Sequence, residues 1–477
     1  MIFTKNIKAL LYSYWSLVII IPVYLLLRLL FINTGFFWDS ITIISKPATY
    51  LYENGLFNFV YNGDFDNGDP QTIQFCLATI WRIFGKSIFA THIFFAFFSG
   101  LTLYQLYKLV ITIFDQKTAQ YVYTLICFEP TFMTQITGLY QDIFLFNFAF
   151  MAMRAFLTNK NRLLLISMLL LCMVSRRGML ICFGLMLAIT IIEIFEHKTN
   201  IKQFIAEYLR IFAPSIVFVF IFIGWRMQNY GWFFTTEATD SGKLVENWNM
   251  FFKNIATFCR YLLDNGRIFL WIIALVLIIR GKYSRYILLK NKKIVVILLA
   301  TLIVMLSVTL SIQNPFGSRY FVIQYIIFLL LYSKLIIYHI ANKKTKYYFI
   351  VSYIALLSGN LWIYPETLSQ SWDSSLAHYP YFELRKNTIN YFNEKNIDLS
   401  DVGVGFPMGS KLAYVDVSKD YFNGFSNIDF KLNKWIVYSN IFNYSDENIS
   451  IIKKMTPIKE WRTGNVFVKI YNNEHGL

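Results

Sequence analysis

The sequence predicts an all-α polytopic membrane protein with a small α/β domain at its C-terminal end. The chain of 477 residues is 56% hydrophobic and only 15% charged, and its mean hydropathy of +0.46 exceeds that of ordinary soluble domains. Apolar runs long enough to cross a bilayer recur over residues 1–364. The composition of residues 365–477 then shifts to Asn, Asp, Ser and Lys, which indicates a separate domain.

About eleven membrane spans are predicted from the length of the apolar runs. A helix needs about 20 residues to cross the hydrocarbon core of a bilayer. The first run is too long for the core of a signal peptide, so we expect it to stay in place as the first helix. The predicted spans cover residues 13–32, 87–112, 119–137, 139–157, 162–176, 178–195, 208–226, 266–280, 294–312, 319–341 and 346–364.

The connecting segments predict the orientation of the chain in the plasma (inner) membrane. Lys and Arg gather in the segments expected to be cytoplasmic, such as residues 280–293 and 343–346, whereas the first outer loop, 33–86, and a second large outer loop, 227–265, contain more acidic residues. The formal charge of +16 therefore reflects membrane sidedness, and nucleic-acid binding is discounted. A cytoplasmic N-terminus and an odd number of spans place residues 365–477 outside.

Local patterns predict further elements in both outer regions. Within the first outer loop, apolar residues recur at helical spacing over 45–61 and 71–84, which suits two helices lying at the membrane interface. In the C-terminal domain, the pattern predicts a helix over 381–396. Runs of β-branched and aromatic residues predict strands over 402–406, 434–438 and 465–471.

No tightly bound metal or cofactor is predicted. The five Cys and five His residues lack the paired spacing of a zinc site or of a disulfide framework. Asp64, Asp66 and Asp69 lie close together, but the glycine position and the missing closing Glu do not fit a calcium-binding loop. We expect a solvated turn there.

Asp39 is the strongest candidate for a catalytic group. It follows Phe36, Phe37 and Trp38 just after the first span, where a carboxylate can accept a proton from an incoming hydroxyl at the membrane edge. The alternative is an N-cap for the helix that follows. Asp142, among apolar neighbours at the start of the fourth span, requires a partner for its charge. The alternatives to a role in positioning the acceptor are a helix N-cap and an ion pair with Arg176 or Arg177.

Four arginines are expected at the outer edge of the membrane, against the overall charge bias. They are Arg176, Arg177, Arg226 and Arg319. A guanidinium group presents a fork of N–H donors that fits phosphate oxygens. The alternatives are contact with lipid headgroups and, for Arg176 or Arg177, an ion pair with Asp142.

Together these segments resemble the GT-C class of integral membrane glycosyltransferases, and more specifically its protein mannosyltransferase and aminoarabinose transferase branch. The resemblance covers about the first 340 residues and concerns the order of spans, outer loops and charged residues. It rests on short motifs, namely Phe36-Phe37-Trp38-Asp39, Phe84-Gly85-Lys86-Ser87, Gly138-Leu139-Tyr140-Gln141-Asp142, Ser175-Arg176-Arg177-Gly178 and Arg319-Tyr320.

The resemblance implies transfer of a sugar from a polyprenyl-phosphate carrier to an acceptor at the outer face of the membrane, with inversion. It implies that Asp39 is the general base and that Asp142 positions the acceptor. Arg319 first, then Arg176 or Arg177, and also Arg226, would bind the donor phosphate. The family often has an Asp-Glu pair at the first site; here Ser40 follows Asp39, so a role for a second carboxylate at that point is not supported.

Two other functions are compatible with a chain of many spans. A polysaccharide polymerase or ligase also has outer arginines, but its main outer loop is expected late in the chain. A lipid-linked-sugar flippase or transporter more often has matching inverted halves and broken spans at the midplane. The acceptor, which can be a protein, a lipid or a glycan, is not predicted.

Overall fold

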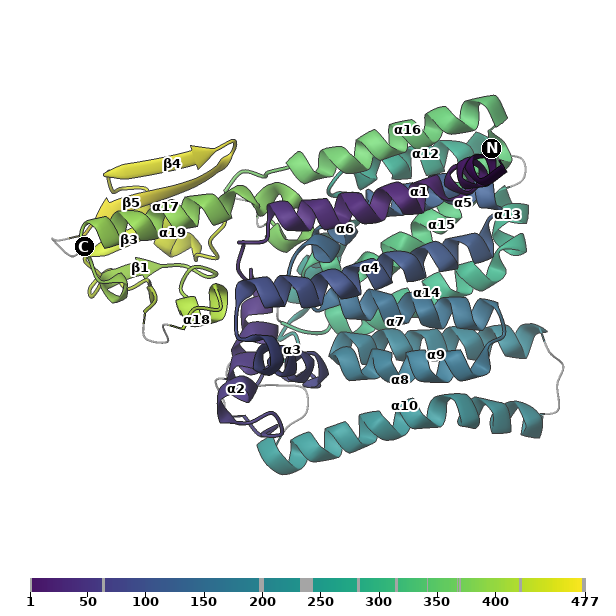
Figure 1. The fold of residues 1–477 in the computed structure, drawn as a ribbon, viewed down its shortest axis with the longest axis horizontal. Helices are drawn as coiled ribbons and strands as arrows, with labels where there is room; N and C mark the ends of the chain where they lie inside the picture. The colour runs from purple at the N-terminus through teal and green to yellow at the C-terminus, as the bar shows by residue number, and fades with distance from the viewer. Residues whose placement is uncertain are drawn as a thin grey trace.

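The structure is a computed structural model that describes residues 2–61, 65–196, 201–231, 243–280, 284–313, 316–340, 342–366, 368, 370–419 and 423–473. It consists of a bundle of long helices and a small domain with a β-sheet at one end of that bundle (Figure 1). The N-terminal end of α1 lies at the other end of the bundle (Figure 1).

Every predicted span coincides with one or two helices. In chain order these are α1 (Ile2–Leu30), α4 (Ile88–Ile113), α5 (Gln116–Cys127) with α6 (Pro130–Thr137), α7 (Asp142–Leu157), α8 (Asn161–Val174), α9 (Arg176–Glu196), α10 (Ile201–Tyr230), α12 (Arg267–Arg280), α14 (Lys292–Thr309), α15 (Val322–His339) and α16 (Asn342–Ser358). The short helix α13 (Ser284–Lys290) precedes α14.

The predicted multi-pass membrane fold is confirmed, while the number of spans stays a prediction. Within the described residues, five helices are long and apolar enough to cross a membrane, and up to seven are found if each of two bent helix pairs forms one span. Three shorter apolar helices, over 14–30, 72–84 and 161–174, add to these.

The predicted span 119–137 is divided into two helices by its own sequence. Glu129 caps the N-terminus of α6, since its Oε2 accepts a hydrogen bond from the backbone N–H of Phe132 at 2.6 Å. Pro130 occupies the first position of α6, where no backbone N–H is needed. The second Glu129 oxygen is left to pair with Arg267.

The first outer loop contains the two predicted helical segments. A π-helical turn, η1 (Ile41–Ser45), runs into α2 (Lys46–Asn54), and α3 (Thr72–Phe84) follows. The helix α3 buries Ile73, Leu77 and Trp81 and exposes Ile83 and Phe84. In the second outer loop, α11 (Trp248–Leu263) bends by 82° from α12 and exposes apolar side chains, as a helix at a membrane interface does.

The C-terminal domain has a five-stranded mixed sheet in the order β2-β1-β3-β5-β4. Its strands are β1 (Val402–Val404), β2 (Ser426–Asn427), β3 (Trp435–Ser439), β4 (Lys459–Thr463) and β5 (Val466–Asn472). β1 is parallel to β2 and β3, and β5 is antiparallel to β3 and β4. Its helices are α17 (Pro380–Glu394), α18 (Leu412–Val415) and α19 (Asp446–Ile452).

The C-terminal domain packs on the segment that leads to Asp39. The Phe36 N–H donates to the Val415 carbonyl at 2.8 Å, and the Trp38 and Phe406 rings are 5.2 Å apart. At Gly35, a Cβ atom would lie 2.3 Å from the carbonyl oxygen of Val415, so only glycine permits this approach. The candidate catalytic residue therefore lies where the domain joins the bundle.

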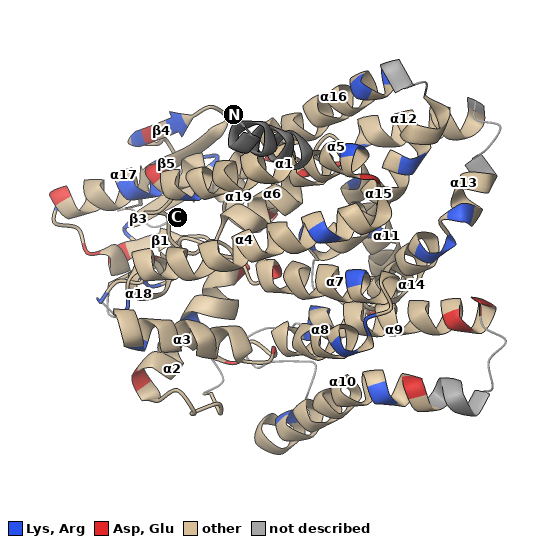
Figure 2. Ribbon diagram, turned by 45° about the vertical axis from the view of Figure 1, so that its right-hand side comes forward, with Lys and Arg blue, Asp and Glu red and all other residues tan. Residues whose placement is uncertain are grey.

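Two of the segments predicted to be cytoplasmic contain several Lys and Arg residues. Figure 2 shows Lys and Arg on α13 and near the start of α16. These segments lie at the end of the bundle away from the C-terminal domain (Figure 1). The assignment of that end to the cytoplasm stays a prediction.

Candidate functional site

Asp39 is presented by a strained turn at the edge of the bundle. Trp38 has a φ of 55°, which is unusual for a residue other than glycine and is held here by ring contacts with Phe37 and Phe406. The N-cap residue of η1 is Ser40, whose side chain makes no capping bond. The Asp39 carboxylate, with 36% of its side chain exposed, contacts Arg319.

Arg319 joins three carboxylates. It lies in the short helix η3 (Ser318–Phe321) at the start of α15, and only 3% of its side chain is exposed. Its Nη2 contacts Asp39, its Nε lies 3.1 Å from Oδ2 of Asp373, and its Nη1 lies 4.0 Å from Oδ2 of Asp142. We refer to Asp39, Asp142, Asp373, Arg177 and Arg319 as the arginine–carboxylate cluster.

Asp142 joins the cluster at the first residue of α7 and is fully buried. Its Oδ1 lies 2.8 Å from Nη2 of Arg177, whose guanidinium lies over the ring of Tyr320 at 4.6 Å. The N-cap of α7 is Gln141. Of the alternatives from the sequence, the ion pair with Arg177 is present and the N-cap is not.

The turn over residues 140–142 has buried polar atoms without hydrogen-bond partners. Within the described residues, the Tyr140 hydroxyl and Oε1 of Gln141 make no hydrogen bond, and the Asp142 oxygens contact Arg177 and Arg319 only as ion pairs. An unsatisfied buried polar atom costs about 1–3 kcal/mol. This turn is therefore suited to a ligand that brings hydroxyl groups.

Asp373 is a member of the cluster that the sequence analysis missed. It lies in η5 (Trp372–Ser374), just after the last predicted span, and is held there because its backbone carbonyl accepts a hydrogen bond from Nε2 of Gln135 at 2.8 Å. Burial raises the pKa of Asp373 to about 6, against the opposing effect of Arg319. One signal was present in the sequence: Trp-Asp-Ser occurs at 38–40 and again at 372–374.

Arg176 and Arg226 lie outside the cluster, in pairs with the aspartates of the first outer loop. Nε of Arg176 is 3.2 Å from Asp69, and Arg226 makes a buried bidentate pair with Asp66 at 2.7 and 2.8 Å. The expected solvated turn is therefore wrong for Asp66 and Asp69, because arginines from α9 and α10 reach these carboxylates. Asp64 lies outside the described residues.

The carboxylates near the site are committed to arginines. Within the parts of the chain that the structure describes, no three His, Cys, Asp or Glu side chains form a group that could hold a metal ion. The cluster can instead exchange one of its carboxylate–arginine contacts for a phosphate–arginine contact, which leaves a carboxylate to accept a proton.

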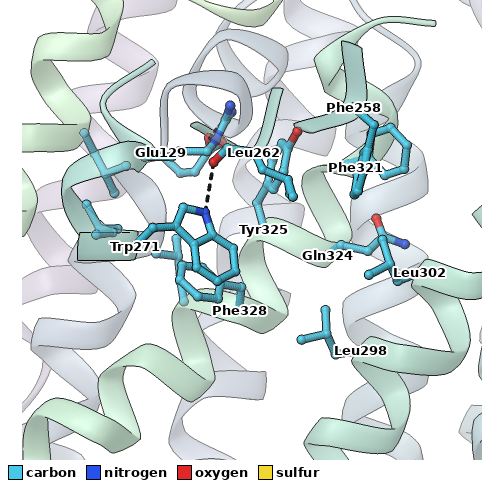
Figure 3. Close-up of a pocket in the computed structure, with 14 residues that line it drawn as sticks. Glu129, Phe258, Leu262, Trp271, Leu298, Leu302, Phe321, Gln324, Tyr325 and Phe328 are labelled. Carbon is cyan, nitrogen blue, oxygen red and sulfur yellow. Dashed lines mark hydrogen bonds and ion pairs between the residues drawn. The ribbon is translucent and has the colours of Figure 1, made fainter. Parts of the chain in front are cut away.

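An apolar cavity of about 120 Å³ lies beside η3 (Figure 3). Phe321 of η3 lines it together with apolar residues of α11, α12, α14 and α15. Trp271, which donates to the Leu262 carbonyl at 2.9 Å, and Phe328 stack in one wall (Figure 3). The cavity suits a hydrocarbon group close to the arginine–carboxylate cluster.

The comparisons with known proteins address the fold. No protein-family model and no curated protein matches the sequence. Among solved structures, the chain is similar to ArnT from Cupriavidus metallidurans, determined bound to undecaprenyl phosphate, with a TM-score of 0.53 over 96% of this chain and 98% of that chain at 9% sequence identity. The chain therefore has the fold of ArnT, and the predicted resemblance to the aminoarabinose transferase branch of the GT-C class is confirmed at the level of fold.

Proposed function

We propose that this protein is a glycosyltransferase that moves a sugar from a polyprenyl-phosphate carrier to an acceptor hydroxyl at the outer face of the membrane, with inversion. One observation supports this proposal most. Asp39, Asp142, Arg177 and Arg319 were each selected from separate parts of the sequence, and they lie together in one cluster. The fold shared with ArnT, a protein solved with undecaprenyl phosphate, supports the class of donor.

Asp39 is the proposed general base. It is the exposed carboxylate of the cluster, so an acceptor can reach it from water. The acceptor oxygen forms a bond to the anomeric carbon as its proton passes to Asp39, while the bond from that carbon to the phosphate oxygen breaks and polyprenyl phosphate leaves. A single displacement of this kind inverts the anomeric centre, and a positioned base contributes typically about 10²- to 10⁴-fold to the rate.

Asp142 and its turn are proposed to position the reacting groups. Oε1 of Gln141, which has no hydrogen-bond partner among the described residues, can accept a hydrogen bond from a sugar or acceptor hydroxyl. The Asp142 oxygens are ion-paired, and they can accept such a bond when their contacts with Arg177 or Arg319 are exchanged. This role requires the cluster to open, since Asp142 is fully buried.

Arg319 and Arg177 are the proposed ligands of the donor phosphate. They provide two buried guanidinium groups on either side of Asp142, where a leaving phosphate gains stabilisation from fixed positive charge. Arg176 and Arg226 were predicted in the same role. A direct contact would require them to leave Asp69 and Asp66, so we propose that they act by fixing the turn beside the cluster.

The apolar cavity beside η3 is proposed to receive part of the donor chain near the phosphate. Its apolar walls suit a hydrocarbon group. The outer loops and the C-terminal domain surround the exposed side of Asp39, where an acceptor from water would enter. A flippase would have no need of a base at this position.

The function is tested by reconstituting the full chain in vesicles with a radiolabelled polyprenyl-phosphate sugar and an extract of surface glycans, lipids and proteins as acceptors. Label transfer that requires the protein supports the proposal. Movement of the lipid-linked sugar between leaflets without any acceptor, and without transfer in its presence, would replace it with the flippase function. Mass spectrometry of the labelled product identifies the acceptor.

A further inference from the structure

The arginine–carboxylate cluster contains more acids than arginines. Three carboxylates, Asp39, Asp142 and Asp373, face two guanidinium groups, Arg177 and Arg319, so the cluster has a formal charge of −1 when all five groups are ionised. All of them except Asp39 are largely buried. A phosphodiester that entered this cluster would add a second negative charge where water screens it poorly.

The surrounding charges do not supply the missing positive charge. The nearby pairs Arg176–Asp69 and Arg267–Glu129 are each neutral. Arg28 donates from its guanidinium to the carbonyl oxygens of Ile136 and Gly138, at 2.6 and 3.0 Å, and makes no ion pair with a member of the cluster among the described residues. Release of Asp39 from Arg319 would hold the cluster at −1 when the phosphate enters, and uptake of one proton would then make it neutral.

We propose that Asp373 is a further functional residue of the donor site, a carboxyl group that takes up one proton from water when the donor phosphate binds to Arg319. This inference rests on the proposed function and deepens it. In the proposed step the phosphate replaces Asp39 on Arg319, the freed Asp39 turns to the acceptor, and protonated Asp373 remains beside Nε of Arg319. No covalent bond other than the O–H bond of Asp373 changes.

The geometry favours Asp373 over the other two acids for this proton. Asp39 is the exposed base and has to stay ionised for its proposed role. Asp142 is paired with Arg177 at 2.8 Å and also faces Arg319. Asp373 has one ion-pair partner, Arg319, among the described residues, and its backbone is fixed to α6 by Gln135.

The titration of Asp373 fits this assignment. Burial raises its pKa to about 6, and the negative charges of Asp39 and Asp142 act in the same direction, while Arg319 and Arg177 oppose them. A bound phosphate adds to the negative charges. The nearby His378 is held neutral, since burial lowers its pKa to about 4. Tyr140, Tyr261 and Tyr320 are the other titratable groups that face Asp373.

The test measures proton uptake on binding of decaprenyl methyl phosphate, a diester that stays monoanionic across the pH range and cannot transfer a sugar. Calorimetry of the full chain in nanodiscs, in two buffers of different ionisation enthalpy, gives the number of protons taken up. For wild type we expect uptake approaching one proton above about pH 6, and a Kd that rises by up to about tenfold per pH unit there. For Asp373→Asn we expect no uptake, a Kd independent of pH, and tighter binding than wild type at about pH 8.

Two further variants separate a functional role from a structural one. Asp373→Glu restores a titratable carboxyl group, so proton uptake should return. Asp264→Asn is the matched control, because Asp264 is a buried carboxyl group that accepts from the Tyr364 hydroxyl at 2.7 Å and lies outside the cluster. It should behave like wild type. Thermal unfolding of each variant reports whether it is folded.

The outcomes separate this inference from the proposed function. If wild type binds no diester at any pH, the proposed donor class fails and this inference falls with it. If wild type binds the diester without proton uptake, the role of Asp373 is wrong while the proposed function stands. The same conclusion follows if folded Asp373→Asn takes up as many protons as wild type.

Discussion

Two buried arginines near η3, Arg267 and Arg319, differ in the charge that surrounds them. Arg267 donates through Nε to Glu129 at 2.9 Å, through Nη1 to the Tyr261 carbonyl at 3.0 Å, and through Nη2 to Thr131. Its guanidinium also lies 3.9 Å from the centre of the Tyr325 ring. Arg319 instead faces three carboxylates, one of them partly exposed.

The difference indicates that Arg267 stabilises the fold and that Arg319 is available for chemistry. A single acid and several neutral acceptors surround Arg267, so its charge is balanced and it links α6, α11 and α12. Around Arg319 the acids are in excess, since three carboxylates face it. Buried ionisable groups whose charges are not balanced are candidates for ligand binding and chemistry.

Asp39→Asn should produce the largest loss of activity. The amide cannot accept the proton of the acceptor, so we expect kcat to fall by about 10²- to 10⁴-fold. Donor binding should be retained or strengthened, because the variant removes one of the competing negative charges from Arg319. Transfer from a radiolabelled donor, with diester binding measured in parallel, checks both. Wild-type turnover in the folded variant would remove Asp39 as the base.

Arg319→Gln should lower kcat by about 10²- to 10³-fold, as expected for loss of a donor that stabilises developing charge. It should also destabilise the protein, because three carboxylates lose their common partner. Arg319→Lys keeps the charge but not the fork, so its activity should be intermediate. Steady-state kinetics and thermal unfolding separate the two effects. Equal donor affinity and turnover in all three proteins would contradict the phosphate assignment.

The fold could be predicted from the sequence to a large extent because its signals are local. The length of each apolar run predicts a helix, and runs of β-branched and aromatic residues predicted three strands that the structure contains, β1, β3 and β5. The strands β2 and β4 were missed: β2 has two residues, and β4 is an edge strand of mostly exposed and charged residues. The division of the predicted span 119–137 at Glu129 was also missed. In the sequence, this N-cap residue is a single charged residue within an apolar run.

The site was predicted less completely because pairing is a property of the folded chain. Asp39, Asp142, Arg177 and Arg319 could be selected since each is a charge at the edge of an apolar run. Their mutual contacts could not be predicted, nor could the burial of Asp66 and Asp69 in a turn rich in Asn and Gly. Asp373 lies in a polar segment, where an acid is not unusual in composition.

Glu129→Gln should remove the counter-charge of Arg267 and leave kcat nearly unchanged in the folded fraction. Loss of the carboxylate leaves Arg267 buried without a counter-charge, and breaking such a pair typically costs about 3–5 kcal/mol. We expect a lower midpoint of thermal unfolding with a kcat close to that of wild type. If kcat falls by as much as in Arg319→Gln while the fold is retained, the contrast between the two arginines is wrong.

Gly68→Ala should have the smallest effect and decides the role of Arg176. Gly68 has a φ of +77°, and a Cβ atom there would lie 2.7 Å from the Arg176 guanidinium, so the variant strains the backbone and displaces that side chain. The strain of the backbone costs about 1–3 kcal/mol.

Gly85→Ala is the matched control, because its φ is +87° and no atom of the described residues lies within 4 Å of its Cβ position. If Arg176 fixes the turn, Gly68→Ala should be less stable than the control while donor KM stays the same. A raised donor KM with unchanged stability would instead assign Arg176 to the donor phosphate, because displacement of its guanidinium would then remove a ligand contact.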